Sequence, residues 1–172
     1  MSTKLTPGTQ APALTLPLAG GGTYDLSAAT PAAATMVIFY RGLHCPVCET
    51  YLTKVKAQAA AFAEAGMPIV LASMDGQERA EKAKADWGLD DLDVAYGLTE
   101  DHARAWGLYI STSIKEAETP VFCEPGTFWV KPDGSLYLID IASMPFARPD
   151  LDILLSKVVA IGNGYPARGT SV

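Results

Sequence analysis

Two short apolar runs, at residues 35–40 and 68–73, dominate the hydrophobic pattern of the chain. Both contain β-branched residues and few polar ones, which is typical of strands covered by helices on both faces, as in a parallel sheet. Residues 127–130 and 136–141 predict two more strands joined by a turn, because the intervening Lys-Pro-Asp-Gly is a strong turn signal. Residues 92–96 predict a short fifth strand.

Apolar side chains spaced three to four residues apart predict a long helix over residues 48–65. Gly66 follows this helix where a left-handed cap is expected, and Pro68 blocks its continuation. The same spacing predicts a last helix that begins near Leu151 and stops at Gly162.

Two shorter helices end in the same tripeptide, Trp-Gly-Leu, at residues 87–89 and 106–108. Asp75 and Glu78 offer a capping pair for the first of them, and Thr99 caps the second. We interpret the two endings as two uses of one C-terminal cap. In this cap the glycine takes the left-handed conformation and the leucine packs back on the helix.

The remaining segments predict a hairpin and two loops. Residues 13–18 and 23–26 flank a run of three glycines and predict an N-terminal β-hairpin, whereas residues 109–126 and 145–149 lack periodicity and predict loops. The order of elements predicts an α/β fold, with a mixed central sheet flanked by helices and an N-terminal β-hairpin extension. No change in composition divides the chain, so we expect residues 1–172 to form a single domain.

Composition and charge exclude several classes of protein. The chain is 49% hydrophobic and 19% charged, which is typical of globular proteins and too apolar for a disordered chain. Its net charge of −6 argues against binding to nucleic acid or to anionic membranes, because both need basic patches. No stretch approaches the roughly 20 apolar residues that span a bilayer, and the first residues lack an apolar leader, so we expect a cytoplasmic protein.

Two of the three cysteines, Cys45 and Cys48, form a Cys-x-x-Cys pair between a predicted strand and a predicted helix. The start of a helix carries about half a positive charge and unpaired N–H groups, which stabilise a thiolate and lower its pKa. A separation of three residues places both sulfurs on one side of the helix, near enough to form a disulfide. Pro46 fits the first helical position, where an N–H has no partner in any case. We therefore predict that Cys45 and Cys48 are catalytic.

Three other side chains are candidates for supporting this pair. Arg41 places a fixed positive charge at the end of the preceding strand, and a protonated His44 would increase the thiolate fraction of Cys45. Arg148 lies in a loop between prolines. An arginine of this kind is usually exposed or paired with a carboxylate, but a rigid loop could aim it at the cysteines.

Structural interpretations compete with the catalytic one. Free cysteines are often buried apolar side chains. Cys45, Cys48 and Cys123 with a histidine could hold zinc, although this set lacks a second close pair. Cys123 is either a second resolving thiol or, more simply, a small packing residue. We interpret His102 as an exposed surface residue and the three tryptophans as core or cap packing, and we predict no cofactor and no metal.

Several motifs resemble the AhpC/TSA (alkyl hydroperoxide reductase/thiol-specific antioxidant) family, a peroxiredoxin-like branch of the thioredoxin-like superfamily. The resemblance covers nearly the whole chain and implies a thioredoxin-like fold and an antioxidant oxidoreductase activity. The matching segments are residues 11–16, 24–27, 39–40 and 126–134. Residues 40–48 (Tyr-Arg-Gly-Leu-His-Cys-Pro-Val-Cys) and 144–149 (Met-Pro-Phe-Ala-Arg-Pro) resemble one subgroup of this family.

The resemblance also marks two departures from the family pattern. The family motif Pro-x-x-x-Thr-x-x-Cys falls on Arg41, Cys45 and Cys48, which implies that Cys48 attacks peroxide. The threonine is therefore absent. The family's arginine, expected near Pro125, is absent too, so Arg41 or Arg148 would have to replace it as a hydrogen-bond donor. Pro125 is a candidate for the cis-proline that faces the cysteines in thioredoxins.

Two catalytic hypotheses use the same residues in opposite roles. A peroxiredoxin-like peroxidase would form a sulfenic acid on Cys48 that Cys45 resolves. A thiol–disulfide oxidoreductase would attack a substrate disulfide with Cys45 and resolve the mixed disulfide with Cys48. The family match favours the first and the missing threonine favours the second. A third hypothesis is a non-catalytic binding module or metal-binding protein of the same fold.

The hypotheses imply partners. We expect a peroxide or a disulfide as substrate, and a thiol reductant such as the thioredoxin or glutathione system. We expect no nucleic acid and no membrane. An edge strand and the family resemblance favour a homodimer.

Overall fold

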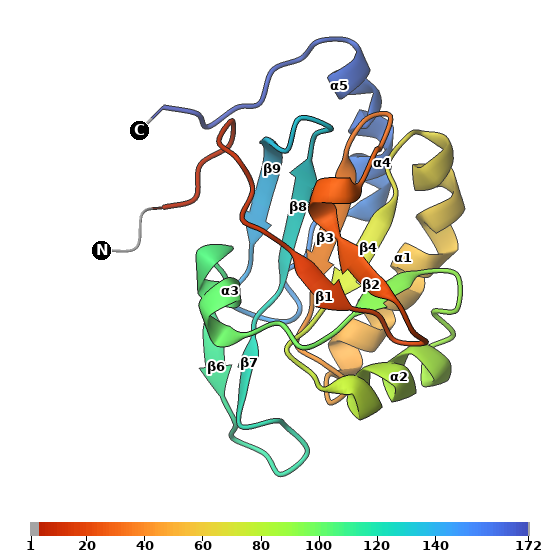
Figure 1. Cartoon of the computed structure of the whole chain (residues 1–172), viewed down its shortest axis with the longest axis vertical. Helices are drawn as coiled ribbons and strands as arrows, with labels where there is room; N and C mark the ends of the chain where they lie inside the picture. Colours follow the sequence, from red (N-terminus) through yellow and green to blue (C-terminus); the bar gives the residue numbers. More distant parts are fainter. Residues whose placement is uncertain (1–3, 172) are drawn as a thin grey trace.

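The computed structural model describes residues 4–171, and its strands are arranged around one mixed central sheet. The strands are β1 (Thr15–Pro17), β2 (Thr23–Asp25), β3 (Thr35–Phe39), β4 (Ile69–Ala72), β5 (Asp93–Ala95), β6 (Ile110–Thr112), β7 (Val121–Cys123), β8 (Gly126–Val130) and β9 (Leu136–Ile141). The central sheet has the order β5-β4-β3-β8-β9 (Figure 1). Strand β3 lies in its middle, parallel to β4 and antiparallel to β8, so the predicted mixed sheet is confirmed.

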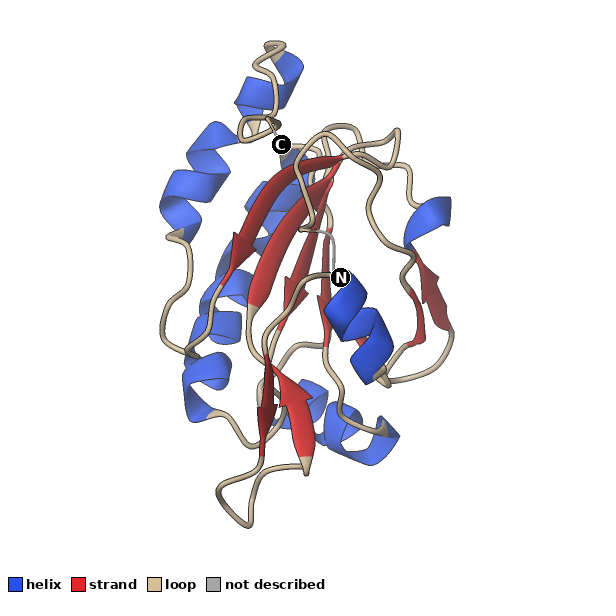
Figure 2. Ribbon diagram, turned by 90° about the vertical axis from the view of Figure 1, so that its left-hand side faces the viewer, coloured by secondary structure: helices blue, strands red, loops and turns tan. Residues whose placement is uncertain are grey.

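Helices cover both faces of this sheet. They are α1 (Pro46–Glu64), α2 (Gln77–Asp86), α3 (Glu100–Ala105), α4 (Leu151–Lys157) and α5 (Val159–Gly162), together with a short 3-10 helix η1 (Leu26–Ala28). Helices α1, α2 and α4 pack on one face, whereas α3 and the hairpin β1–β2 pack on the other (Figure 2). Within residues 4–171, no helix combines the length and the apolar character needed to cross a bilayer.

The central position of β3 explains its uninterrupted apolar sequence. All five of its residues are buried. Met36 and Ile38 join the cluster beneath α1, whereas Val37 and Phe39 join the cluster beneath α3. Because successive side chains of a strand point to opposite faces, a strand between two layers of helices needs apolar residues at every position.

Both Trp-Gly-Leu endings form the predicted cap. Gly88 and Gly107 have φ angles of +64° and +73°, in the left-handed region that glycine enters without strain. The N–H groups of Leu89 and Leu108 donate hydrogen bonds back to carbonyl oxygens in the last turns of α2 and α3, and both leucine side chains are buried. The tryptophan before each glycine is buried as well, as predicted.

Three predictions about local structure are wrong. Residues 109–126 are not a loop, because β6 and β7 pair as an antiparallel hairpin that buries Phe122 and Cys123. Each strand has only three residues, which is too short for alternation to be detected. The predicted last helix is interrupted at Val158, where α4 ends and α5 begins. Asp75 does not cap α2, whose N-cap is Gly76.

The N-terminal hairpin protects one edge of the sheet. The N–H of Ala19 donates a hydrogen bond of 2.8 Å to the carbonyl of Val94, and Leu18 forms an isolated antiparallel bridge to Ala95. Strand β5 therefore has no long free edge, which removes a site for pairing with other chains.

Candidate functional site

The two cysteines lie where β3 ends and α1 begins, as predicted. Cys45 is the N-cap of α1, and its Sγ accepts a hydrogen bond of 3.2 Å from the backbone N–H of Cys48. Pro46 occupies the first turn. Both side chains are free thiols and are fully buried, with 0% of their surface exposed. The helix start therefore supplies an N–H group directly to one sulfur of the pair.

The environment separates the pKa values of the two thiols. The hydrogen bond from the Cys48 thiol, together with the Cys48 backbone N–H and Arg41, lowers the pKa of Cys45 to about 6. Burial raises the pKa of Cys48, and the interaction of its thiol with Cys45 raises it further. The pair therefore carries one negative charge near neutral pH, centred on Cys45 and shared through the hydrogen bond to Cys48.

This charge distribution predicts an early titration. In the reduced protein, the ultraviolet absorbance of the thiolate should rise with pH through a midpoint near 6, because the pKa of Cys45 is lowered to about 6. A free thiol titrates near 8.5. Cys45→Ser should remove this transition. Cys123→Ser is the matched control and should retain it, because burial raises the pKa of Cys123 to about 12. A first transition above pH 8 in the parent protein contradicts the assignment.

Arg148 contacts the second cysteine. Its Nη2 donates a hydrogen bond of 2.9 Å to Cys48 Sγ, from a loop that is 100 residues further along the chain. The Nε and Nη1 atoms of this guanidinium are also buried and have no hydrogen-bond partner. The loop thus aims a cation at the cysteines, which was the less common of the two situations considered for Arg148. The positive charge of Arg148 acts against the rise in the pKa of Cys48 that burial causes.

Tyr51 positions this arginine. Its hydroxyl donates a hydrogen bond of 2.8 Å to the carbonyl of Pro149, and the Arg148 guanidinium lies 4.9 Å from the centre of its ring. The face of an aromatic ring attracts a cation, so the ring holds the guanidinium while the hydroxyl holds the loop. From the sequence, Tyr51 is only one of the apolar positions of the predicted helix. Helical spacing shows which side of a helix is apolar, but not which residues of other elements pack against it.

Arg41 lies on the other side of the pair, in a network that the sequence did not predict. Its Nε lies 3.1 Å from Oε2 of buried Glu124, and its guanidinium lies 4.7 Å from the centre of the Phe122 ring. Glu118 is a more distant partner, at 3.9 Å. Glu124, Phe122 and Glu118 belong to the hairpin region that was expected to be a loop. The positive charge of Arg41 lowers the pKa of Cys45, which agrees with the role predicted for it.

His44 does not supply the positive charge that we expected. Burial, followed by the charge of Arg41, lowers the pKa of its imidazole below 6.5. Its ring packs against Phe122 with 4.7 Å between the ring centres, and neither ring nitrogen has a hydrogen-bond partner. At neutral pH the imidazole is therefore uncharged, and it packs against Phe122 instead of stabilising the Cys45 thiolate.

Asp75 fixes the loop before the motif, a role that the capping interpretation missed. Its Oδ2 accepts a hydrogen bond of 2.8 Å from the backbone N–H of Leu43, and its Oδ1 lies 3.3 Å from Nε of Arg79. The carboxylate is 1% exposed. Gly42 has a φ of +135°, and a Cβ there would lie only 2.7 Å from Asp75 Oδ1, so this position requires glycine. Because β3 and β4 are parallel neighbours, the residues after both strands meet at one edge of the sheet.

Pro125 does not contribute as proposed, whereas Cys123 and His102 lie as their simpler interpretations predicted. Residues 4–171 contain no cis peptide bond, so Pro125 lacks the conformation of a thioredoxin cis-proline. Cys123 is fully buried, with its Sγ 3.5 Å from the carbonyl of Tyr40, and it packs as a small core residue. His102 is exposed, as predicted. No cluster of three metal-ligating side chains exists within the described part of the chain, so the zinc hypothesis has no ligand set there.

The family's arginine is absent near Pro125, and the next position has no room for a side chain. A side chain at Gly126 would collide with Leu108 and Phe128, which pack against the strand at this point. The guanidinium beside Cys48 comes instead from Arg148, on the loop after β9. Cys45, which the sequence resemblance places at the family's threonine, accepts the N–H of Cys48 through its sulfur.

Solved structures share this fold over most of their length. The peroxidoxin BcpB from Mycobacterium tuberculosis aligns with a TM-score of 0.73 and 19% identity, over 92% of this chain and 99% of that one. A hypothetical protein from Sinorhizobium meliloti 1021 aligns with a TM-score of 0.69 and 22% identity, over 99% and 92%. The bacterioferritin comigratory protein of Xanthomonas campestris aligns with a TM-score of 0.65 and 22% identity, over 86% and 90%.

The sequence itself decides the family. No curated protein sequence matches the chain. The AhpC/TSA family profile, however, matches residues 7–139, which include the N-terminal hairpin, the cysteine motif, strand β8 and the first residues of β9. This match covers well over half of the 172 residues. The chain therefore belongs to the AhpC/TSA family.

Proposed function

We propose that this protein is a thiol peroxidase in which Cys48 attacks the peroxide and Cys45 resolves the product. Membership of the AhpC/TSA family makes the chain an oxidoreductase. The observation that carries the finer proposal is the hydrogen bond of 2.9 Å from Arg148 to Cys48 Sγ. A guanidinium at this place stabilises the attacking thiolate and then the negative charge that develops on the leaving oxygen. The Xanthomonas campestris relative is described as reducing alkyl peroxides.

Cys48 reacts with the peroxide, and Cys45 first accepts a proton and later forms the disulfide. A proton passes from the Cys48 thiol to the Cys45 thiolate, which places the negative charge next to Arg148. The Cys48 thiolate attacks one peroxide oxygen, the O–O bond breaks, and the leaving alkoxide takes up a proton, so that Cys48 becomes a sulfenic acid. Cys45, whose pKa is lowered to about 6, loses its proton again and attacks the Cys48 sulfur, which releases water and forms a disulfide.

Burial of the cysteines favours a small substrate. Both side chains are 0% exposed, beneath Arg148 on one side and the loop from Arg41 to His44 on the other. A peroxide presents only two oxygen atoms to the sulfur, whereas a protein disulfide must bring a whole polypeptide surface to it. The burial therefore supports peroxide reduction over reduction of protein disulfides.

A thiol–disulfide oxidoreductase is the second candidate, and the lowered pKa of Cys45 favours it. In this role the Cys45 thiolate attacks a substrate disulfide and Cys48 resolves the mixed disulfide. For either activity the electrons come from a thiol reductant. We expect the reaction to take place in the cytoplasm, where free thiols stay reduced. A homodimer remains our expectation.

Single substitutions of the two cysteines separate the candidates. For a peroxidase, Cys48→Ser should abolish peroxide consumption and sulfenic acid formation, whereas Cys45→Ser should still form a stable sulfenic acid. Mass spectrometry with a sulfenic acid trap measures both. Cys123→Ser is the control and should behave as the parent, because Cys123 is a packing residue.

The oxidoreductase candidate predicts the opposite pattern. Cys48→Ser would then trap a mixed disulfide through Cys45, and the parent would reduce a protein disulfide such as insulin. A parent protein that consumes no peroxide rules out the peroxidase.

A further inference from the structure

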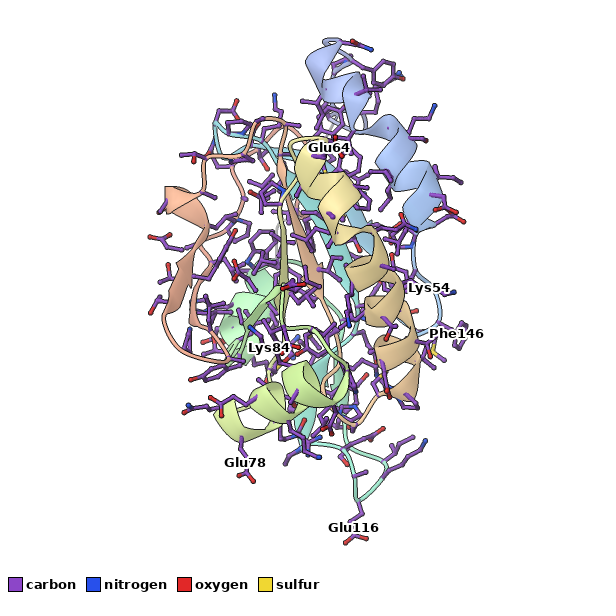
Figure 3. The ribbon with its side chains drawn as sticks, turned by 90° about the vertical axis from the view of Figure 1, so that its right-hand side faces the viewer. Lys54, Glu64, Glu78, Lys84, Glu116 and Phe146 are labelled. Carbon is purple, nitrogen blue, oxygen red and sulfur yellow. The ribbon has the colours of Figure 1, made fainter. Side chains whose placement is uncertain are left out.

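A groove runs from the surface to Arg148, along α1 from Val47 to Gln58. It has a volume of about 630 Å³, which suits a small molecule. One wall is a stripe of α1 with a spacing of three to four residues, and the other is the loop that carries Arg148. The α1 stripe consists of Val47, Thr50, Tyr51, Lys54 and Gln58. Figure 3 shows Lys54 and Phe146 projecting from the same side of the molecule, one from each wall.

The groove holds two cations, Lys54 and Arg148, that have no carboxylate partner among the described residues. Among residues 4–171, no carboxylate lies within 4.0 Å of the charged nitrogens of Lys54 or Arg148. Arg148 also keeps two buried N–H groups without acceptors. Buried donors without acceptors are costly, so a carboxylate in the groove would stabilise them. The protein has a net charge of −6, so an anion approaches favourably only where cations act locally.

The groove also carries two acidic side chains. Asp150 caps α4, with its Oδ1 3.0 Å from the N–H of Ile153, and Asp152 accepts a hydrogen bond of 2.9 Å from Nε2 of Gln58. Both carboxylates line the groove together with Lys54 and Arg148. A ligand that carries carboxylates and an ammonium group therefore finds side chains of opposite sign for both kinds of group within one groove.

We propose that this groove binds the reductant of the active site, and that the reductant is a small zwitterionic thiol of the glutathione type. The inference rests on the proposed function, because it assigns the thiol that reduces the Cys45–Cys48 disulfide. A carboxylate of the thiol pairs with Lys54 and Arg148, and its ammonium group pairs with Asp150 or Asp152. Once Cys48 is part of a disulfide it carries no charge, so the Arg148 guanidinium is available to the incoming anion.

The bound thiolate attacks Cys48, the sulfur in contact with Arg148. The attack breaks the Cys48–Cys45 bond, forms a mixed disulfide on Cys48 and releases Cys45 as a thiolate. A second thiol then attacks the mixed disulfide, so that two thiols are oxidised to one disulfide and both cysteines return to the reduced form. Cys45 is a good leaving group in the first step, because a thiol of lowered pKa departs readily.

Reduction of a preformed disulfide tests this inference without peroxide. The full-length protein is oxidised with diamide, and mass spectrometry follows its reduction by glutathione, by neutral 2-mercaptoethanol and by cationic cysteamine. Each rate is divided by the rate of the same thiol with hydroxyethyl disulfide, which removes intrinsic reactivity. We expect glutathione to show saturation and the highest normalised rate.

A pair of substitutions on α1 sharpens the test. Lys54→Glu should lower the ratio of the glutathione rate to the 2-mercaptoethanol rate about fivefold, as expected for loss of one ion pair. Lys56→Glu makes the same charge change outside the groove, where Lys56 lies next to Gly88, and should leave this ratio within about twofold of the parent.

Three results overturn the inference: equal normalised rates for the three thiols, equal effects of the two substitutions, or saturation only with a protein dithiol. None of these depends on peroxide consumption. A parent that discriminates between the thiols but consumes no peroxide refutes the proposed function alone.

Discussion

Replacing Arg148 with alanine should lower kcat/KM for hydrogen peroxide about 100- to 1000-fold, the range seen when one donor to a developing negative charge is removed. The structural reason is the hydrogen bond of 2.9 Å from Arg148 to Cys48 Sγ, since the arginine that the family resemblance implies near Pro125 is absent. Stopped-flow measurement of peroxide consumption gives the rate. Arg148→Lys should recover only part of the activity, because an ammonium group cannot reproduce the planar guanidinium on the Tyr51 ring.

A control variant isolates this effect. Arg104 is an exposed arginine in a surface ion pair with Glu100, so Arg104→Ala removes the same charge far from any expected chemistry. Its kcat/KM should match that of the parent. A second readout is the thiolate titration of Cys48 in a Cys45→Ser background, which should move to higher pH without the cation. Parent-like peroxide kinetics in Arg148→Ala would show that another group supports the reaction.

Replacing Asp75 with alanine should reduce the free energy of unfolding by about 2 to 4 kcal/mol, as expected for a buried carboxylate that leaves its donors unsatisfied. The variant leaves the N–H of Leu43 without an acceptor and removes the carboxylate that pairs with Arg79. Urea titration followed by circular dichroism measures the change. Asp75→Asn keeps an oxygen for the Leu43 N–H but loses the charge, so an intermediate loss is expected.

The matched control for Asp75 is Asp86, the last residue of α2, the helix that follows Asp75 in the chain. Asp86 pairs with Lys82 on the surface of α2, where both side chains are about half exposed, so Asp86→Ala should cost less than about 1 kcal/mol. Asp75→Ala should also slow peroxide consumption, because the loop from Arg41 to His44 loses its anchor. Equal losses of stability in the two alanine variants would contradict the anchoring role.

The predictable parts of the fold are those that local sequence determines. Strand β3 and the two Trp-Gly-Leu caps depend on periodicity and on glycine, which are visible within a few residues. The position of Cys45 at the start of α1 follows from the same local signals, since Pro46 marks the first turn. The hairpin β6–β7 was missed because its strands are short and no glycine turn joins them, whereas three glycines marked the equally short hairpin β1–β2.

The supporting residues were harder to predict because their partners are distant in sequence. Asp75 and Leu43 are 32 residues apart, and Arg148 and Cys48 are 100 residues apart. Asp75 followed a predicted parallel strand next to β3, and that topological signal was sufficient to place it near the motif. His44 was assigned a charge because of its neighbours in sequence, but burial against Phe122 removes that charge.

The spacing between the motif and Arg148 has a consequence for synthesis of the protein. Chains are made from the N-terminus, and domains fold as units. A ribosome that has completed β3 and α1 must still add the segment from α1 to Arg148 before the guanidinium exists. Until then the nascent polypeptide carries the two thiols of the motif without their cation, so its full reactivity towards oxidants arises only when the loop that carries Arg148 closes on them.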